Sequence, residues 1–328
     1  MIGRVGVIGG GAWGTALAQV AADGGEETLL WARESEVVES INGRHENALF
    51  LAGIALSPSI RATADLADLA ECDALLVVTP AQHMRSVLRG LVAPGTPLIL
   101  CAKGMEESTT KLMHDVAHEE QPDSPIAVLS GPTFAHEVAA RLPAAVTLAV
   151  KDQVVGEQLR ARLARPWFRP YLSEDVVGAE IGGAVKNVLA IACGVVEGRG
   201  LGLNARAALI SRGFAEMTRF GLARGARAET LAGLSGLGDL VLTCSSTSSR
   251  NFSLGKGLGE GRSAQELLAD RRTVAEGAFT APVLHRAAKA MGVDMPIVEG
   301  VCALLGGHAS IDEVVEELLA RPLRSEGV

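Results

Sequence analysis

The fold of this 328-residue chain can be inferred from one short segment, Val5-Gly6-Val7-Ile8-Gly9-Gly10-Gly11-Ala12-Trp13-Gly14. Its first four residues form a short apolar run that is typical of a buried strand, and the alanine-rich segment from Trp13 to Ala22 predicts a helix. Between the two, Gly9, Gly11 and Gly14 fit the pattern Gly-x-Gly-x-x-Gly. This order of strand, glycine turn and helix gives the glycines a physical purpose that a lone motif would lack.

Each glycine of this turn has its own expected task. Gly9 allows the tight turn, Gly11 lets the backbone approach a diphosphate, and Gly14 lets helix and strand pack closely. The start of the helix offers free N–H groups and a partial positive charge to the same anion. We therefore predict a dinucleotide-binding turn with contacts at Gly9, Gly11, Ala12, Trp13 and Gly14. The alternative is a glycine-rich turn without a ligand.

Short apolar runs and helical patterns alternate through the first half of the chain. The strand candidates are 5–8, 28–31, 74–78, 98–100, 126–129, 145–150 and 169–172, and the helix candidates are 13–22, 81–91, 109–118 and 154–163. Strict alternation implies right-handed crossovers and a parallel sheet. We predict an α/β fold: a Rossmann-type doubly wound sheet over residues 1–175, which binds the dinucleotide. After about Glu174 the strand signals stop, and residues 176–328 are expected to form an all-helical substrate and catalytic domain.

Composition and charge exclude several functional classes. The chain is 48% hydrophobic with a formal net charge of −8, and an acidic surface of this kind repels nucleic acid. Its five cysteines are odd in number and include no Cys-x-x-Cys pair, which disfavours disulfides and a metal site. We see no signal peptide, and the apolar stretch from Asn187 to Val196 is shorter than the ~20 residues that span a bilayer. We expect a cytoplasmic protein without stable membrane insertion.

Arg33 bears on the choice of cofactor. It follows the second predicted strand, where an NAD-specific site usually carries Asp or Glu to hold the ribose 2′-hydroxyl. A guanidinium can instead pair with a 2′-phosphate and stack on the adenine, which favours NADPH. Glu34 stands beside it and can accept from a 2′-hydroxyl, and an arginine that is merely solvated is a further alternative. Both NADPH and NADH therefore remain open, with NADPH weakly favoured.

Lys186 and Asp239 are the candidates for proton transfer. A ketone reduced by a nicotinamide needs an acid beside its oxygen. Lys186 and Asn187 form a polar pair in the apolar helical segment 180–190, and burial lowers the pKa of a lysine toward the useful range. Asp239, flanked by glycine and apolar residues, can orient and tune such a lysine. The alternatives are a lysine that reaches solvent and an aspartate in an ordinary turn.

Ser249, Arg250 and Asn251 precede a helical stretch that starts near Phe252. A hydroxyl, a guanidinium and an amide at a helix start form a suitable cradle for a phosphate group. The alternative is an ordinary Ser or Asn helix cap beside a surface arginine.

Taken together, these motifs resemble the NAD(P)-dependent glycerol-3-phosphate dehydrogenase family of bacterial type, essentially from end to end. The resemblance is carried by Gly9-Gly10-Gly11-Ala12-Trp13-Gly14-Thr15-Ala16, Ala102-Lys103-Gly104, Ser130-Gly131-Pro132-Thr133-Phe134-Ala135, Val185-Lys186-Asn187, Gly236-Leu237-Gly238-Asp239, Ser249-Arg250-Asn251 and Val274-Ala275-Glu276-Gly277. The resemblance implies reversible reduction of dihydroxyacetone phosphate to sn-glycerol 3-phosphate without a metal. It also implies that the product is used in glycerophospholipid synthesis.

The resemblance also implies roles for individual residues. Lys186 matches the proton donor and acceptor, assisted by Asp239 and Lys103. The implied substrate contacts are Lys103, Gly131, Thr133, Lys186, Asp239, Ser249, Arg250 and Asn251. The implied cofactor contacts are Gly9, Gly11, Ala12, Trp13, Gly14, Arg33, Lys103, Ala135, Arg250, Val274 and Glu276. Many relatives carry Ser where this chain has Ala12 and Thr133, so the first position lacks a hydroxyl and the second keeps one.

Two other functions stay open at this point. A two-domain β-hydroxyacid or 6-phosphogluconate-type dehydrogenase also places a catalytic lysine on the first helix after its nucleotide domain, although the Ser249-Arg250-Asn251 cluster argues against it. A non-catalytic regulator that senses NAD(P) would keep the first domain but would have no use for Lys186 with Asp239. We expect a small phosphorylated substrate and, from the family, a homodimer.

Overall fold

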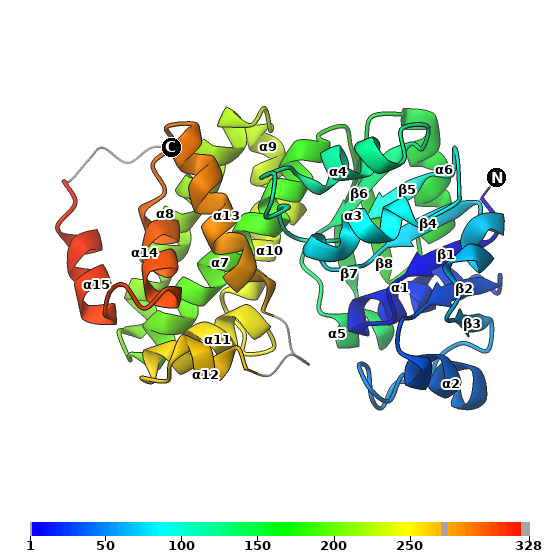
Figure 1. Cartoon of the computed structure of the whole chain (residues 1–328), viewed down its shortest axis with the longest axis horizontal. Helices are drawn as coiled ribbons and strands as arrows, with labels where there is room; N and C mark the ends of the chain where they lie inside the picture. Colours follow the sequence, from blue (N-terminus) through cyan, green and yellow to red (C-terminus); the bar gives the residue numbers. More distant parts are fainter. Residues whose placement is uncertain (1, 270–274, 323–328) are drawn as a thin grey trace. The chain divides into compact units, whose positions relative to one another are not determined.

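The computed structural model describes residues 2–269 and 275–322. Within them the chain forms two compact units (Figure 1). The first contains the described residues up to Ala102 and the segment Met113–Val176. The second contains the short segment Lys103–Leu112 and the described residues from Val177 onward.

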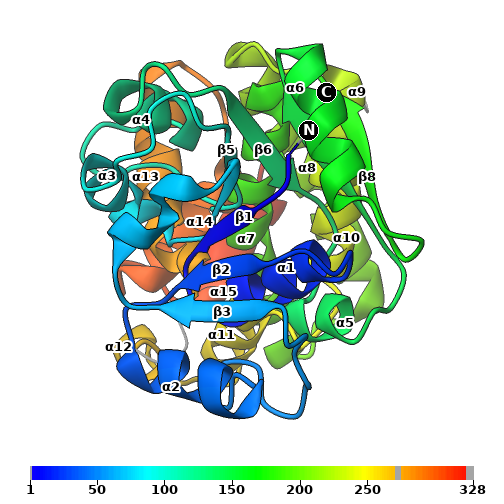
Figure 2. The same ribbon diagram turned by 90° about the vertical axis from the view of Figure 1, so that its right-hand side faces the viewer.

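The first unit is built on an eight-stranded sheet with the order β3-β2-β1-β4-β5-β6-β7-β8. The strands are β1 (Val5–Ile8), β2 (Thr28–Trp31), β3 (Ile60–Thr63), β4 (Ala74–Val77), β5 (Leu98–Leu100), β6 (Ile126–Ser130), β7 (Ala144–Val150) and β8 (Phe168–Ser173). β1 pairs in parallel with β2 on one side and with β4 on the other, and β2 pairs in parallel with the edge strand β3 (Figure 2). All four residues of β1 are buried, as expected for a parallel strand covered on both faces.

Helices connect the strands of this unit and cover the sheet. They are α1 (Ala12–Ala22), α2 (Ser35–Arg44), the 3₁₀ turn η1 (Leu66–Glu71), α3 (Ala81–Arg89), α4 (Met113–Glu120), α5 (Ala135–Ala139) and α6 (Gln153–Leu163). α1 is buried from Gly14 to Ala22 because small residues let it lie close to the sheet. Its apolar side chains join those of β1 and β4 in one core.

The predicted Rossmann-type sheet followed by a helical region is confirmed, with corrections in detail. The sheet is not wholly parallel, because β7 runs antiparallel to β6. The two strands are joined through α5, which has only five residues, whereas a parallel return usually needs a longer crossover. The helix expected over 109–118 begins at Met113 instead. The strand β3 and the helices α2 and α5 were not among the expected elements.

Within residues 177–269 and 275–322, every regular secondary-structure element is helical. The elements are α7 (Val176–Gly198), α8 (Gly202–Ala223), α9 (Ala228–Leu231), the π turn η2 (Leu234–Gly238), α10 (Asp239–Thr243), α11 (Arg250–Gly259), α12 (Ala264–Leu267), α13 (Glu276–Ala290), α14 (Pro296–Leu305) and α15 (Ile311–Leu319). α7 supplies many of the buried apolar side chains of this unit. By length and composition α7 could cross a membrane, but 89% of its most apolar window is buried inside the protein, as in a core helix.

The segment Lys103–Leu112 belongs to the helical unit although it lies between β5 and α4 in the sequence. Met105 and Leu112 pair as an antiparallel bridge, and both side chains are buried in the core of that unit. The Arg286 guanidinium on α13 donates to the Glu107 carbonyl oxygen at 2.8 Å. These anchors make Lys103 part of the helical unit.

Candidate active site

The glycine turn between β1 and α1 has the strained and crowded geometry that its sequence predicts. Gly9 has a φ of +130°, and a Cβ there would lie 2.9 Å from the Val78 carbonyl oxygen. A Cβ on Gly14 would collide with the carbonyl oxygen of Gly9. Only glycine fits both places, since one needs an unusual backbone angle and the other a close approach of helix and strand.

Gly11 differs, because neither its conformation nor the protein's packing requires a glycine. Its φ of −69° and ψ of 179° are open to most residues. Apart from Gly11 itself and its two chain neighbours, no atom of the described residues lies within 4 Å of where its Cβ would be. A glycine with open space in front of it fits a backbone that a ligand must approach closely.

The N-terminus of α1 adds to this fit for a diphosphate. Gly11 is the N-cap and has no side chain to cap the helix, and the first turn of α1 contains no acidic residue. Uncapped N–H groups at a helix start attract an anion through hydrogen bonds and the helix dipole. The turn therefore has the chemistry needed to hold the diphosphate of a dinucleotide.

Arg33 lies just beyond β2 in the same unit. Its guanidinium is paired with the Glu34 carboxylate at 2.9 Å, and its side chain is 78% exposed. The two residues that favoured different cofactors in the sequence thus form one surface ion pair. Such a pair is weakly held in water, so Arg33 is able to turn toward a 2′-phosphate.

Gly131, Thr133 and Ala135 follow β6 in the first unit. A Cβ on Gly131 would lie 2.9 Å from the Cα of Val146 on β7, so packing requires the glycine. The Thr133 hydroxyl donates to the Gly131 carbonyl oxygen at 3.3 Å, and Ala135 is the first residue of α5. These three residues lie together on one connection.

The helical unit contains a buried cluster of charges around Asp239. Asp239 is completely buried, and Lys186 is only 5% exposed. Lys186 Nζ donates to Asp239 Oδ1 at 2.6 Å and to the Thr243 hydroxyl oxygen at 2.8 Å. Lys103 Nζ donates to the other carboxylate oxygen, Oδ2, at 2.7 Å. The structure thus brings together the three predicted catalytic residues, Lys186, Asp239 and Lys103.

Gly182 allows α7 to approach the π turn closely enough for this pairing, and Gly236 allows the π turn to pack against the end of α9. A Cβ on Gly182 of α7 would collide with the Ser235 carbonyl oxygen in η2. A Cβ on Gly236 would collide with the Leu231 carbonyl oxygen. The π turn leads directly into α10, whose first residue is Asp239. The close approach therefore places the carboxylate beside Lys186, four residues further along α7.

The electrostatics of this cluster favour proton transfer at Lys186. The pKa of Lys186 is lowered to about 8, chiefly by burial; the Asp239 carboxylate opposes this lowering, and the positive charge of Lys103 adds to it. An ammonium group has three donors, and contacts with the described residues use two of them on Lys186. The third proton remains for a ligand, and a pKa near 8 lets it leave and return near neutral pH.

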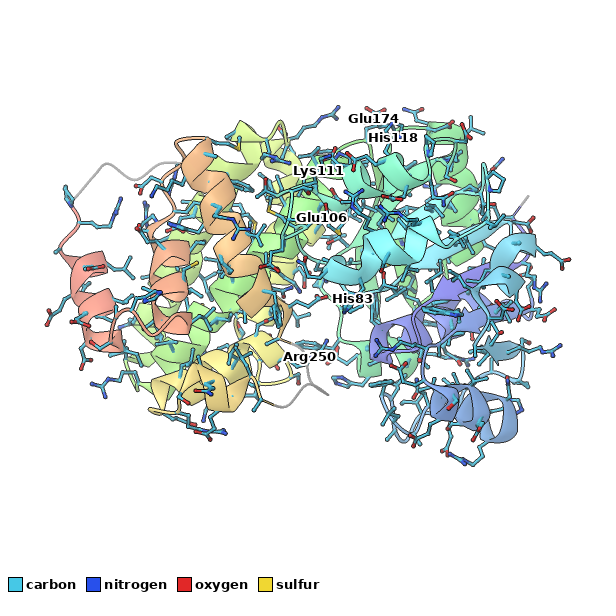
Figure 3. The ribbon with its side chains drawn as sticks, viewed as in Figure 1. His83, Glu106, Lys111, His118, Glu174 and Arg250 are labelled. Carbon is cyan, nitrogen blue, oxygen red and sulfur yellow. The ribbon has the colours of Figure 1, made fainter. Side chains whose placement is uncertain are left out.

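The three residues of the predicted phosphate site, Ser249, Arg250 and Asn251, have different local environments. The Ser249 hydroxyl caps α11 by accepting from the Phe252 N–H at 3.2 Å. Arg250 begins α11 and is exposed (Figure 3). Asn251 is buried, and its side-chain oxygen accepts from the Gly277 N–H at 2.9 Å, which leaves its NH₂ group as the part that can donate to an anion.

Glu276 begins α13 and is half-buried. Burial raises the pKa of its carboxyl group, while the positive charges of Arg250, Lys103 and Lys186 lower it. Glu276 is therefore within electrostatic reach of the same charged cluster. Val274 lies outside the described residues.

Thr243 is the member of this cluster that the sequence did not reveal. Its hydroxyl accepts from Lys186 and donates to Asp239 Oδ1 at 3.3 Å. The one available signal is its position four residues after Asp239 on a helix, where the two side chains lie on the same face. A threonine in an apolar helix is too common for that signal to have been decisive.

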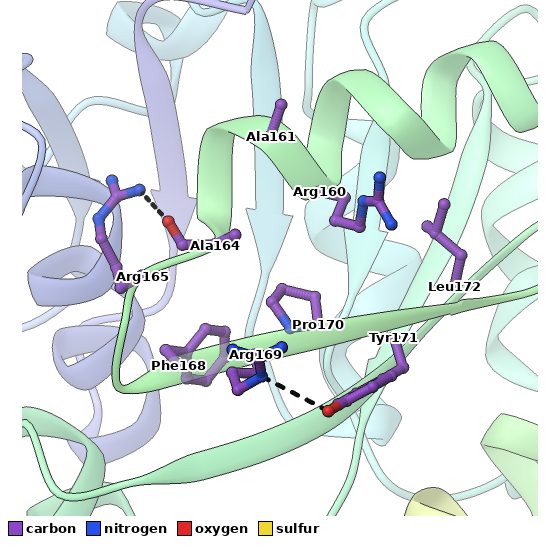
Figure 4. A pocket seen from close by; sticks show the side chains of 9 residues that line it. All are labelled: Arg160, Ala161, Ala164, Arg165, Phe168, Arg169, Pro170, Tyr171 and Leu172. Atoms are coloured by element: carbon purple, nitrogen blue, oxygen red, sulfur yellow. Dashed lines mark hydrogen bonds between the residues drawn. The ribbon is translucent and has the colours of Figure 1, made fainter.

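A separate groove of about 310 Å³ lies between α6 and β8 in the first unit (Figure 4). Its lining includes Arg160, Arg165 and Arg169. Arg165 donates to the carbonyl oxygens of Arg162 and Ala164, and Arg160 pairs with Glu157. The Arg169 guanidinium lies 6.0 Å from the Tyr171 ring. None of the predicted site residues lines this groove.

The chain is similar to known proteins over almost all of its length. Models described as the N-terminus and the C-terminus of NAD-dependent glycerol-3-phosphate dehydrogenase match residues 4–155 and 175–316. Curated proteins named glycerol-3-phosphate dehydrogenase (NAD(P)+) are 64% identical in Erythrobacter litoralis, over 99% of this chain and 98% of the relative, and 65% identical in Novosphingobium aromaticivorans, over 98% of each. The crystal structure of glycerol-3-phosphate dehydrogenase from Coxiella burnetii is 37% identical and superposes with a TM-score of 0.93, covering 98% of this chain and 99% of that one.

Proposed function

The chain belongs to the NAD-dependent glycerol-3-phosphate dehydrogenase family, and from this premise we infer that it reduces dihydroxyacetone phosphate to sn-glycerol 3-phosphate, reversibly, with NADH or NADPH. The observation that carries the inference to individual residues is the buried Lys186–Asp239–Lys103 cluster. It supplies a proton and positive charge for a ketone that becomes an alcohol. A regulator that only senses the cofactor has no use for such a cluster, because burying charges is costly.

Lys186 is the proton donor in the direction of reduction. When bound, the nicotinamide supplies the hydride to the ketone carbon. Lys186 gives the proton not used by Asp239 and Thr243 to the ketone oxygen and is left as a neutral amine. In the reverse direction the neutral amine takes the proton from the alcohol. Asp239 fixes the direction of the lysine side chain and, by its charge, keeps the pKa from falling further.

Lys103 stabilises the negative charge that develops on the ketone oxygen. Its ammonium group is fixed by Asp239 before substrate arrives, so little reorganisation is needed when the charge forms. Ser249, Arg250 and Asn251, assisted by Gly131 and Thr133, hold the phosphorylated substrate. Arg250 supplies a guanidinium that can bind phosphate through two parallel hydrogen bonds, and Asn251 supplies its NH₂ group.

The proposed cofactor contacts begin with the glycine turn of the first unit. The diphosphate site is formed by Gly9, Gly11, Ala12, Trp13 and Gly14. The Gly9 N–H donates to the Trp31 carbonyl oxygen at 3.0 Å and shapes the turn, so N–H groups such as those of Gly11 and Ala12 are the donors to the diphosphate. Arg33 contacts the adenosine end with a preference for the 2′-phosphate of NADPH. The remaining proposed contacts are Lys103, Ala135, Arg250, Val274 and Glu276. These assignments rest on the family resemblance and, for the glycine turn, on the open space at Gly11.

The protein acts in the cytoplasm as a homodimer. Support for the dimer comes from the start of α8, where Leu203 is 68% exposed and Leu201, the residue just before the helix, is 42% exposed. Apolar side chains that lie together on a surface favour a contact with another protein surface. The molar mass in solution, measured by light scattering, tests this state.

The reaction is tested by following the loss of NADH or NADPH absorbance after addition of dihydroxyacetone phosphate. Dihydroxyacetone, a β-ketoacid and the product of 6-phosphogluconate oxidation serve as alternative substrates. Turnover of dihydroxyacetone phosphate alone is expected. Turnover of another member of the panel instead would favour a related dehydrogenase, and binding of the cofactor without any turnover would favour a regulator.

A further inference from the structure

Asn47 is a fully buried polar residue outside the residues assigned to the site so far. It follows α2 in the first unit and has no exposed surface. Its side-chain NH₂ group donates to the Gly10 carbonyl oxygen at 2.8 Å and to the Thr15 hydroxyl oxygen at 2.8 Å. Its side-chain oxygen accepts from the Phe50 N–H at 3.1 Å. A buried amide with both N–H groups directed at the glycine turn and its helix has a specific structural task.

Thr15 extends this network to the next peptide of the turn. A hydroxyl has one proton, and that of Thr15 is donated to the Gly11 carbonyl oxygen at 2.9 Å while its oxygen accepts from Asn47. The Gly11 carbonyl also accepts from the Thr15 N–H at 3.0 Å. Asn47 therefore holds the carbonyl of Gly10 directly and that of Gly11 through Thr15.

Holding these carbonyls also fixes the N–H groups on the same peptides. A peptide unit is planar and trans, so its C=O and N–H point in opposite directions. The Gly10 carbonyl directed at Asn47 turns the Gly11 N–H away from the protein interior around Asn47. The Gly11 carbonyl directed along α1 likewise turns the Ala12 N–H out of the helix start. These are donors of the proposed diphosphate site.

Asn47 is itself held firmly in place. The Leu51 N–H donates to the Asn47 carbonyl oxygen at 2.9 Å, and the Ser40 hydroxyl donates to the Glu46 carbonyl oxygen at 2.8 Å. His45, with a φ of 51°, turns the chain at the end of α2 and brings this segment back toward the sheet. The segment therefore presents the amide in one orientation.

We propose that Asn47 is a positioning residue for the cofactor site: it orients the Gly10 and Gly11 peptides so that their N–H partners receive the diphosphate. The proposal rests on the proposed binding of a dinucleotide. Because Asn47 is buried, it acts through the turn and does not touch the ligand. Its effect is therefore expected on ligands that contain a diphosphate and not on those that lack one.

The test compares Asn47→Asp with the wild type by fluorescence titration of NADPH and by competition with two fragments. ADP-ribose contains the diphosphate, and adenosine 2′-phosphate does not. Aspartate keeps the acceptor for the Phe50 N–H but loses both donors, and it places a carboxylate oxygen against the Gly10 carbonyl. We expect about a tenfold or greater rise in the Kd of NADPH and of ADP-ribose, and less than about a threefold change for adenosine 2′-phosphate.

Asn42→Asp is the matched control. The Asn42 side chain also makes a pair of hydrogen bonds to backbone, with the N–H and the carbonyl oxygen of Ala62 on β3, which is not part of the glycine turn. Its substitution should leave both fragment affinities unchanged. Thr15→Val, which removes the hydroxyl between Asn47 and Gly11, is measured in parallel and should weaken ADP-ribose selectively, so the test does not depend on one variant folding.

Two results would overturn the proposal. The first is an unchanged affinity of Asn47→Asp or Thr15→Val for ADP-ribose. The second is an equal loss for both fragments in a variant whose thermal unfolding matches that of the wild type, since this indicates a general structural role. Failure of the wild type to bind NADPH or ADP-ribose would instead contradict the proposed function itself.

Discussion

The glycine turn and the Asp239 cluster recognise charge in opposite ways. The turn between β1 and α1 has no charged side chain among its residues and works through backbone N–H groups and open space in front of Gly11. The cluster in the helical unit consists of two ammonium groups on one buried carboxylate, supplied by three separate parts of the sequence. The glycine turn is suited to binding a diphosphate, whose charge stays the same during the reaction, and the Asp239 cluster is suited to transferring a proton. Variants in the two regions should therefore separate cofactor binding from turnover.

The largest separation is expected for Lys186→Ala. Removal of the proton donor should lower kcat by about 10²–10⁴-fold, the usual contribution of general acid catalysis. The Kd of NADPH should change little, because the diphosphate turn is untouched. Steady-state kinetics give kcat, and a fluorescence titration gives the Kd of NADPH. A variant that turns over near the wild-type rate would show that another residue is the acid.

Arg250→Ala tests how the phosphate of the substrate is held. A hydrogen bond to a charged group contributes about 1.5–3 kcal/mol, so kcat/KM for dihydroxyacetone phosphate should fall about 10–100-fold. Dihydroxyacetone, which lacks the phosphate, should be a very poor substrate of the wild type and should lose less in the variant. Arg250→Lys should recover only part of the loss, because a point charge cannot form two parallel hydrogen bonds. If the preference for phosphate persists in Arg250→Ala, the anion is held elsewhere, and Lys103 is the next candidate.

Gly11→Ala and Gly14→Ala sharpen the difference between ligand space and packing space. An alanine at position 11 would contact no described atom outside its chain neighbours, and its backbone angles would be ordinary ones. The free energy of unfolding should therefore change by less than about 0.5 kcal/mol. NADPH binding should still weaken, on the order of tenfold, because the methyl group occupies the path of the diphosphate. Gly14→Ala should instead destabilise the fold, since its Cβ collides with backbone. Denaturant unfolding of both variants is the measurement, and equal destabilisation would refute the distinction.

Arg33→Asp should have the smallest effect. The exposed Arg33–Glu34 pair is weak, and a carboxylate at position 33 repels a 2′-phosphate but can accept from a 2′-hydroxyl. The KM of NADPH should rise about three- to tenfold more than that of NADH. An equal rise for both cofactors would mean that Arg33 only packs against the adenine.

The sequence predicted the parts of the fold and site that depend on neighbouring residues. Continuous apolar runs such as those at 5–8 and 74–78 predicted buried strands, and the spacing of three glycines predicted the turn. By contrast, β3 has the mixed composition Ile-Arg-Ala-Thr and lies at the sheet edge, where one strand face is less covered. Its alternating burial gives no continuous apolar run, so pattern alone did not reveal it.

The charged cluster depends on contacts between distant residues. Lys186 and Asp239 are 53 residues apart, and Lys103 and Asp239 are 136 apart. The sequence marked each residue as unusual and the family resemblance grouped them, but their distances come from the packing of α7, η2 and the segment Lys103–Leu112. The sequence of this segment does not indicate that it belongs to the helical unit, because the apolar side chains of Met105 and Leu112 could be buried in either core. Asn47 was missed for the same reason, since its partners Gly10 and Thr15 are more than thirty residues away.

The role of Lys186 as proton donor and acceptor can be tested by the pH dependence of the reaction in both directions. Burial lowers the pKa of Lys186 to about 8, and reduction needs the protonated form while oxidation needs the neutral amine. As pH rises through about 8, kcat/KM for dihydroxyacetone phosphate should therefore fall, and kcat/KM for sn-glycerol 3-phosphate should rise to a plateau. Asp239→Asn should move both transitions to lower pH, because the carboxylate raises this pKa. Two profiles that change in the same direction, or transitions that do not move in Asp239→Asn, would contradict the assignment of Lys186.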